Sequence, residues 1–247
     1  MDFFAKTDIG KIRENNEDYC FAGKLDIFGK DLYLFVVADG MGGCNKGEIA
    51  SFMAAEEVVR FVKDSSDFIE DDPDKILKVL ELSVKSANKS IFEKSFKQSD
   101  YFGMGTTIIA GIICQNHLYI VNVGDSRAYR ISDGEFAQLT KDNSYVQQLL
   151  EEGLINDAQA KIHKKKNVIT RAVGSEKNLL VDKYDFALKY KDVLLFCSDG
   201  LTNMCEDNEI KTVLEKEISS EEKAMQLVEL ANRSGGRDNI TVIVVNC

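Results

Sequence analysis

Hydrophobic positions along the chain follow two patterns: short, nearly continuous runs, and longer stretches with apolar residues three or four positions apart. The short runs are rich in β-branched and aromatic residues, which favours β-strands. Because polar residues seldom interrupt these runs, we expect most of the strands to be covered on both faces. The predicted strands span residues 32–38, 107–114, 118–123, 128–131, 193–197 and 240–245.

The longer stretches predict helices that each bury one side. They cover residues 47–63, a segment that begins at Asp72 and Pro73, and residues 224–231. Asp72 is suited to cap a helix and Pro73 to occupy its first position. In the first helix, the spacing assigns Phe52 to the buried side.

The order of these elements indicates the fold class. Three predicted strands between residues 107 and 131 follow one another without a helix between them. This favours an α+β fold with antiparallel sheets flanked by helices over a doubly wound parallel sheet. One proline occurs in 247 residues and no Gly/Ser/Pro-rich linker is present, so we expect a single domain spanning residues 1–247.

The charge balance excludes several classes of partner. Asp and Glu number 41 against 31 Lys and Arg, a net charge of −10 that disfavours nucleic-acid binding. Residues 1–19 are too charged for a signal peptide, and no run approaches the roughly 18 apolar residues of a membrane helix. We therefore expect a cytoplasmic protein without membrane insertion. Six cysteines without a CxxC pair, and two histidines, leave no zinc site of the finger type.

Acidic residues lie at the ends of four predicted strands. They follow three strands and precede a fourth, at Asp39, Asp125, Asp199 and Asp238. Taken singly, an Asp-Gly pair after a strand is most often a turn. If the sheets bring these carboxylates together, they repel one another unless a cation neutralises them. Such an all-oxygen site suits Mg²⁺ or Mn²⁺, and several carboxylates can hold two ions.

The glycines after Asp39 add to this hypothesis. Without a Cβ, Gly40 lets a backbone carbonyl approach a metal closely, while Gly42 and Gly43 permit a turn into the helix that begins near Gly47. Without the other aspartates, a permissive turn between strand and helix would be the preferred explanation.

Three competing motifs fail at single positions. A dinucleotide-binding loop needs glycine where the chain has Asn45, and a P-loop needs Ser or Thr after Gly-Lys, whereas residues 46–48 read Lys-Gly-Glu. A phosphatase with a nucleophilic aspartate needs a second carboxylate two residues later, where this chain has Met41.

Six motifs in order extend from residue 13 to residue 241. They read Arg-Glu-Asn-Asn-Glu-Asp (13–18), Asp-Gly-Met-Gly-Gly (39–43), Met-Gly-Thr-Thr (104–107), Gly-Asp-Ser-Arg (124–127), Ser-Asp-Gly-Leu (198–201) and Gly-Gly-Arg-Asp-Asn-Ile-Thr (235–241). The series resembles that of the metal-dependent Ser/Thr protein phosphatases of type 2C, the PPM family. Met41 resembles the bacterial branch, since many eukaryotic members have histidine there. The resemblance implies a β-sandwich of two antiparallel sheets flanked by pairs of helices, with a two-metal centre at one end.

The resemblance also implies a ligand set for two Mn²⁺ or Mg²⁺ ions. It makes Asp39 the bridge between them and the Gly40 carbonyl a ligand of one ion. Asp199 and Asp238 would serve the other. Asp125 resembles the residue that, together with Asp199, holds a weaker third ion.

The remaining motif residues resemble groups around the ions. Arg13 would grip the substrate phosphate, because its planar fork matches two phosphate oxygens. Glu17 and Asp18 resemble acidic residues around the metal-bound waters, and Asn239 and Thr107 resemble supporting residues.

The implied reaction is hydrolysis of phosphoserine or phosphothreonine by direct in-line attack. Two ions can lower the pKa of a bridging water enough to supply hydroxide at neutral pH. The leaving alkoxide needs a proton that Met41 cannot give, so a metal-bound water is the first candidate for the general acid and His163 the second. The implied partners are phosphorylated proteins and a cognate bacterial Ser/Thr kinase, and we expect a monomer.

Residues 143–173 resemble the family's mobile flap beside the active site. Within them, residues 161–167 form a basic patch in an acidic protein, and Lys164, Lys165 and Lys166 would attract phosphorylated segments. On composition alone, a solvated loop explains the patch equally well.

Two rival functions stay open: a relative that binds phosphoproteins without turnover, and a hydrolase of small phosphates. The presence of Asp39, Asp199 and Asp238 together argues against the first.

Overall fold

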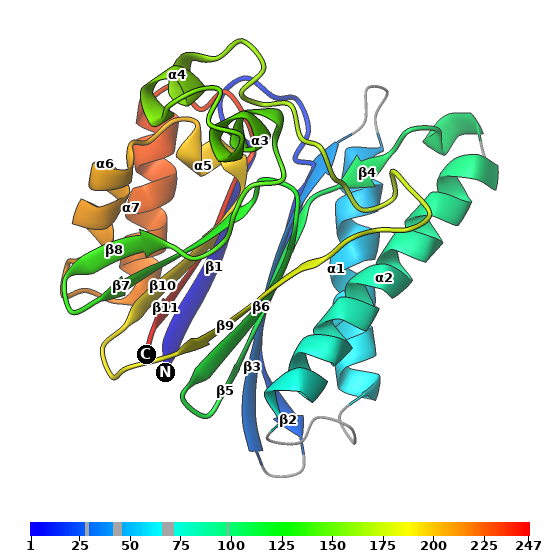
Figure 1. Ribbon diagram of the computed structural model, residues 1–247. Coiled ribbons are helices and arrows are strands. Elements are labelled where there is room, and N and C mark those ends of the chain that lie inside the picture. Colours follow the sequence, from blue (N-terminus) through cyan, green and yellow to red (C-terminus); the bar gives the residue numbers. More distant parts are fainter. Residues whose placement is uncertain (28–29, 42–45, 66–71, 98) are drawn as a thin grey trace.

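The computed structural model describes residues 1–27, 30–41, 46–65, 72–97 and 99–247. Two sheets pack face to face, and helices cover the outer face of each, as Figure 1 shows. The neighbouring strands within each sheet are antiparallel. The α+β sandwich expected from the sequence is therefore confirmed.

The first sheet has the strand order β1-β11-β10-β7-β8. It consists of β1 (Asp2–Asp8), β7 (Arg127–Ser132), β8 (Glu135–Gln138), β10 (Val193–Cys197) and β11 (Ile240–Asn246). The second sheet has the order β2-β3-β5-β6-β9, and a short strand pairs with the end of β3. It consists of β2 (Asp18–Ile27), β3 (Lys30–Met41), β5 (Ile108–Cys114), β6 (His117–Val123), β9 (Asp182–Ala187) and the short β4 (Gly105–Thr106).

The helices fall into three groups in Figure 1. Two long helices, α1 (Gly47–Asp64) and α2 (Pro73–Lys97), cover the second sheet, and a 3-10 turn follows at Ser99–Tyr101. Three helices lie outside the first sheet, α5 (Asp199–Thr202), α6 (Asp207–Leu214) and α7 (Ser220–Arg233). Two short helices, α3 (Tyr145–Glu151) and α4 (Asp157–Ile162), lie above one end of the sandwich. Among the described residues, none of the helices combines the length and the apolarity needed to cross a membrane.

Strand β3 shows why the hydrophobic runs are continuous. Phe35 and Val37 pack in the core between the two sheets, while Leu34, Val36 and Ala38 pack in the core beneath α1 and α2. Successive side chains of a strand point to opposite faces, so a strand between two cores needs apolar residues at every position. The prediction of strands covered on both faces is confirmed for β3.

Two details differ from the sequence-based expectations, and a third expectation is not tested. The third strand continues through Asp39 and Gly40 to Met41, because Gly40 and Met41 pair with β4 instead of leaving the sheet. Phe52 is 48% exposed, so its assignment to the buried side was wrong; its ring packs edge-on against Tyr19 at 5.2 Å between centroids. The predicted turn at Gly42 and Gly43 lies outside the described residues.

The sequence pattern also missed five strands, namely β1, β2, β4, β8 and β9. In β9, intermediate and exposed positions alternate, and it lies at the edge of its sheet. A half-exposed edge strand carries polar residues and lacks the continuous apolar run that identified the central strands. Asp72 and Pro73 do begin a helix, and an Asp72 carboxylate oxygen accepts a hydrogen bond from Asp74 N at 3.0 Å.

Candidate metal centre

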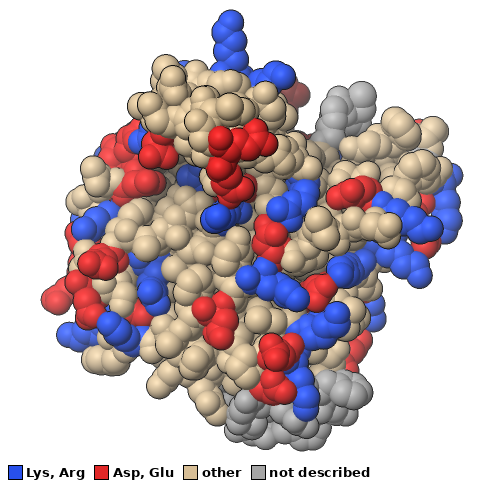
Figure 2. All heavy atoms as spheres, viewed as in Figure 1, with Lys and Arg blue, Asp and Glu red and all other residues tan. Residues whose placement is uncertain are grey.

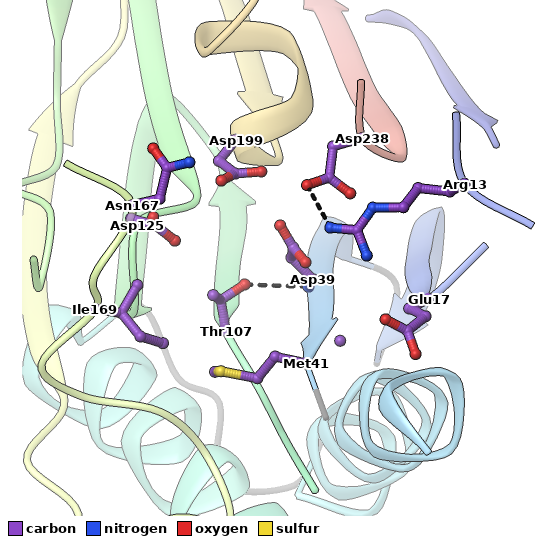
Figure 3. A pocket seen from close by; sticks show the side chains of 11 residues that line it. Arg13, Glu17, Asp39, Met41, Thr107, Asp125, Asn167, Ile169, Asp199 and Asp238 are labelled. Atoms are coloured by element: carbon purple, nitrogen blue, oxygen red, sulfur yellow. Dashed lines mark hydrogen bonds and ion pairs between the residues drawn. The ribbon is translucent and has the colours of Figure 1, made fainter. Parts of the chain in front are cut away.

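A pocket of about 390 Å³ opens at the end of the sandwich where the acidic strand ends meet. It is lined by Arg13, Glu17, Asp39, Gly40, Met41, Thr107, Asp125, Asn167, Ile169, Asp199 and Asp238. In Figure 3 the carboxylates of Asp39, Asp199 and Asp238 point toward one another, with Asp125 to one side. The two sheets thus bring together the four aspartates that the sequence placed at strand ends.

Asp39 is held in place through its backbone. Its N–H donates to Thr107 Oγ1 at 3.0 Å, and its carbonyl accepts from Thr107 N at 2.8 Å. Thr107 Oγ1 also lies 2.8 Å from Ser126 Oγ, next to Asp125 in the chain. Thr107, expected to be a supporting residue, therefore links the strand that carries Asp39 to the turn that carries Asp125.

Asp18 lies behind the pocket and does not line it. It is directly opposite Asp39 in the β2–β3 register and is 7% exposed. Ser198 Oγ donates to Asp18 Oδ2 at 2.7 Å and accepts from Thr241 N at 3.0 Å. This serine thereby joins β2 to the end of β10 and the beginning of β11.

Asn239 positions the loop that carries Arg13 and Glu17. Its Oδ1 accepts from Glu17 N at 2.8 Å, and its Nδ2 donates to the carbonyls of Ile9 and Asn15 at 3.0 and 2.9 Å. The residue is 4% exposed, and a buried amide with both ends satisfied holds its partners firmly. Asn239 therefore holds the backbone of the loop that carries Arg13 and Glu17.

The glycines after Asp39 and Asp199 are required by close approach between chain segments. A Cβ at Gly40 would lie 2.2 Å from the Gly47 carbonyl oxygen and 2.5 Å from that of Glu17. A Cβ at Gly200 would lie 1.9 Å from the Asn239 carbonyl oxygen. A permissive turn does not explain these two glycines, because both lie within regular elements. Each lies where two backbone segments of the site touch and leave no space for a side chain.

The clustered carboxylates perturb one another. Burial, followed by repulsion from Asp18 and Asp199, raises the pKa of Asp39 well above its usual range. Burial is also the main cause that raises the pKa of Asp18 to about 7, of Asp125 to about 8 and of Asp199 to about 6, and repulsion between carboxylates adds to each. Such a site favours a bound cation, because the cation lets all of these groups stay ionised.

Arg13 offsets part of the negative charge. Its Nη2 donates to Asp238 Oδ2 at 2.9 Å, while 48% of its side chain remains exposed (Figure 3). The guanidinium therefore lies at the solvent side of the carboxylates, where it can meet an incoming anion.

The residues of the pocket fit hard divalent cations. Carboxylate oxygens and a backbone carbonyl are the ligands that Mg²⁺ and Mn²⁺ prefer. Asp18 Oδ1 is buried without a hydrogen-bond partner among the described residues, which leaves acceptor capacity next to the pocket. In the described part of the chain, no group of three or more Asp, Glu, His or Cys side chains is arranged so that it could hold a metal ion by itself. Water ligands, which Mg²⁺ usually keeps, would complete the coordination.

Two lining residues were missed by the sequence analysis, namely Asn167 and Ile169. Both come from the segment 143–173, where an amide and an apolar residue after a lysine run carry no recognisable signal. His163 does not line the pocket; its Nδ1 accepts from Lys165 N at 3.1 Å, and its ring lies 5.8 Å from that of Tyr145. The structure therefore does not support His163 as the general acid.

The base of this segment is fixed by Asn143, a third residue whose role the sequence analysis missed. Its Oδ1 accepts from Gly124 N at 2.9 Å, and its Nδ2 donates to Asp182 Oδ2 at 2.7 Å. Its backbone N–H donates to the Gly124 carbonyl at 2.7 Å, and its carbonyl accepts from Thr170 N at 2.7 Å. Asn143 thus ties both ends of the segment to the turn before Asp125.

Comparison with known proteins agrees with this geometry. The family model of protein phosphatase 2C matches residues 13–232. The serine/threonine phosphatase Stp of Listeria monocytogenes serotype 4b is 39% identical over 241 residues, which are 97% of this chain and 93% of that protein. The two-sheet fold and the acidic pocket therefore define a phosphatase of this class, and the chain belongs to the protein phosphatase 2C family.

Two solved structures are similar over nearly their whole length. The serine/threonine phosphatase Stp1 from Staphylococcus aureus has a TM-score of 0.92 at 34% identity, with 100% of this chain and 95% of that chain covered. The catalytic domain of the serine/threonine phosphatase PstP in complex with two manganese ions has a TM-score of 0.85 at 35% identity, with 99% and 96% covered.

Proposed function

We propose that this chain is a metal-dependent protein serine/threonine phosphatase. It hydrolyses phosphoserine and phosphothreonine by direct in-line attack, without a phosphoenzyme. One observation carries the proposal: four aspartates from separate parts of the chain and an exposed arginine line a single pocket. The two manganese ions in the PstP structure support a dinuclear metal centre in this protein.

The acidic residues of the pocket would hold the two Mn²⁺ or Mg²⁺ ions. Asp39 would be shared by both ions, the Gly40 carbonyl would serve one, and Asp199 and Asp238 would serve the other. When bound, two such ions supply Lewis acidity and lower the pKa of water toward neutrality. Asp125, which lines the same pocket beside Asp199, would hold a weaker third ion.

The remaining residues bind and orient the substrate. Arg13 binds two oxygens of the phosphate and exchanges its ion pair with Asp238 for the substrate anion, since a planar guanidinium matches both. Glu17 lines the pocket beside Asp39 and, with Asp18 behind it, orients water by accepting hydrogen bonds. Asn239 keeps Arg13 and Glu17 in place through the loop contacts described above.

Several wider properties belong to the same proposal. The 247 residues act as one domain, with residues 143–173 as a flap beside the pocket. The protein works as a cytoplasmic monomer on phosphorylated proteins and reverses a cognate Ser/Thr kinase. Its similarity to bacterial serine/threonine phosphatases across almost the whole chain supports the action on phosphorylated proteins.

One assay tests the activity. Release of phosphate is measured from a phosphothreonine protein and from a small aryl phosphate, with Mn²⁺, with Mg²⁺ and with a chelator. We expect metal-dependent release from the protein substrate. Release from the aryl phosphate alone would indicate a hydrolase of small phosphates, and the absence of metal-dependent release from either substrate would defeat the enzyme assignment.

A further inference from the structure

A groove of about 730 Å³ lies between α2 and the segment of residues 174–181 that leads into β9. One wall is formed by the α2 residues Lys89 and Phe92, and the other by Lys177 and Leu180. None of these four residues lines the acidic pocket. The groove is therefore a separate surface feature of the molecule.

Asn88 holds the two walls together. This side chain is 2% exposed; its Oδ1 accepts from Gly174 N at 2.7 Å, and its Nδ2 donates to the Glu176 carbonyl at 2.9 Å. Leu179, buried to 4% exposure, anchors the same segment in the core under α2. Because a satisfied buried amide and a core residue fix the segment against the helix, the groove is preformed.

The groove combines apolar and basic groups with one acidic residue, Glu93, whose carboxylate pairs with Lys97 at 3.1 Å. Leu180 is 71% exposed, and the ring of Phe92 packs against that of Phe96 at 4.6 Å between centroids. Lys89 and Lys177 are exposed and form no ion pair with any residue that the structure describes. Their charges are thus free to pair with a ligand, and the exposed leucine offers it an apolar contact.

The charge of this flank is opposite to that of the whole chain. Helix α2 contains six lysines and three acidic residues, whereas the chain carries a net charge of −10. In Figure 2, Lys and Arg side chains gather over the right-hand part of the molecule, where Figure 1 shows α2. A basic groove on an acidic protein selects an acidic partner segment by charge complementarity.

The groove is connected to the pocket by a single stretch of backbone. Ile169 lines the pocket, Val173 pairs with Thr106 beside β3, and Lys177 lines the groove. Ile169 and Lys177 are eight positions apart in the chain, so their Cα atoms lie at most roughly 29 Å apart. An extended peptide of about eight residues or more spans that distance.

We propose that this groove docks an acidic segment of the phosphoprotein substrate, with at least one large apolar side chain, while the phosphorylated residue occupies the pocket. The proposal rests on the phosphatase activity proposed above. Docking adds binding energy remote from the reacting phosphate, so it lowers KM for long substrates and leaves short ones unaffected. The concave shape, with an apolar and a basic group on each wall, fits a peptide better than the flat surface of a lipid bilayer.

The kinetic test compares substrate lengths. Two phosphothreonine peptides carry Glu-Glu-Leu-Glu about ten residues before or after the phosphothreonine, and a third peptide lacks this segment. The variant Lys89→Glu/Lys177→Glu should raise KM about fivefold or more for at least one long peptide, because two attractive pairs become repulsive. Its kinetics on the short peptide and on an aryl phosphate should not change. Lys191→Glu/Lys211→Glu makes the same charge change away from the groove and serves as the control.

A binding measurement separates docking from catalysis. Fluorescence anisotropy with a labelled, unphosphorylated Glu-Glu-Leu-Glu peptide needs neither metal nor turnover. Binding to the wild type and to the control variant, with at least a fivefold weaker Kd for Lys89→Glu/Lys177→Glu, supports the proposal even if the phosphatase assignment fails. Equal binding by all three proteins overturns it. If the wild type binds phosphatidylserine vesicles, the groove variant does not, and peptide binding is equal, the groove is a lipid contact and the proposal is wrong.

Discussion

Gly200 lies against the backbone of Asn239. The effect of Gly200→Ala on the free energy of unfolding tests whether glycine is needed here for lack of space. Gly200 lies in helix α5 without a positive φ. Its backbone conformation is therefore open to alanine. If there were also space for a Cβ, Gly200→Ala would stabilise the protein by about 0.5–1 kcal/mol, because alanine favours the helix and reduces the conformational entropy of the unfolded chain. The structure predicts the opposite sign.

The magnitude follows from the distance. A Cβ at residue 200 lies 1.9 Å from the Asn239 carbonyl oxygen, whereas an ordinary contact measures 3.4 to 4 Å. The start of α5 and the residue before β11 must therefore separate by about 1.5 Å, and both are buried backbone. Overpacking of this kind costs about 3 kcal/mol. For a chain of this size, that lowers Tm by about 6–12 °C.

Thermal unfolding followed by circular dichroism, with a chelator present, measures this effect apart from metal binding. Gly134→Ala is the control: Gly134 has φ +80° and nothing within 4 Å of a Cβ, so the substitution costs about 1 kcal/mol through backbone strain alone. The displacement also moves Asp199 relative to Asp238, so metal-dependent activity should fall more than Tm alone explains. An unchanged or higher Tm for Gly200→Ala would refute the steric reasoning.

Four further predictions follow from other parts of the structure. Asp39→Asn should abolish turnover and the rise in Tm caused by Mn²⁺ while the circular dichroism spectrum stays native; near-normal activity would exclude a bridging role. Asn143→Ala should lower the free energy of unfolding, measured in urea, by about 2–4 kcal/mol, because it leaves Gly124 N and the Asp182 carboxylate without their buried partner. A change below about 0.5 kcal/mol, the size expected for a surface substitution, would contradict this. Hydrogen bonds from Lys85 and Lys183 lower the pKa of Glu81 to about 2, so its stabilisation is present above pH about 4.5 and is lost as pH falls toward 2. Glu81→Gln should therefore cost about 1–2 kcal/mol at pH 7 and little near pH 2, and a pH-independent difference would rule out the ion-pair explanation. Replacing Lys164, Lys165 and Lys166 by alanine should reduce activity on a phosphoprotein more than on an aryl phosphate, and equal losses would remove their role in substrate attraction.

Strand β3 illustrates what local sequence pattern can predict. Its uninterrupted apolar run identified a strand buried on both faces, because each of its side chains enters one of two cores. The edge strands β1 and β9 escaped detection since half-exposed positions admit polar residues. The acidic strand ends could also be recognised in the sequence, because a carboxylate next to a buried strand is noticeable when it recurs at four strands.

By itself, the sequence determined the class of fold, the acidic set and its preference for hard cations, because residue type and spacing are local properties of the chain. Only the tertiary structure decided that Asp18 lies opposite Asp39, that Gly200 touches Asn239, and that Ile169 reaches the pocket. These contacts join segments that are distant in sequence, so they depend on strand order and register. No local pattern encodes the distance between two such segments; the packing of the two sheets sets it.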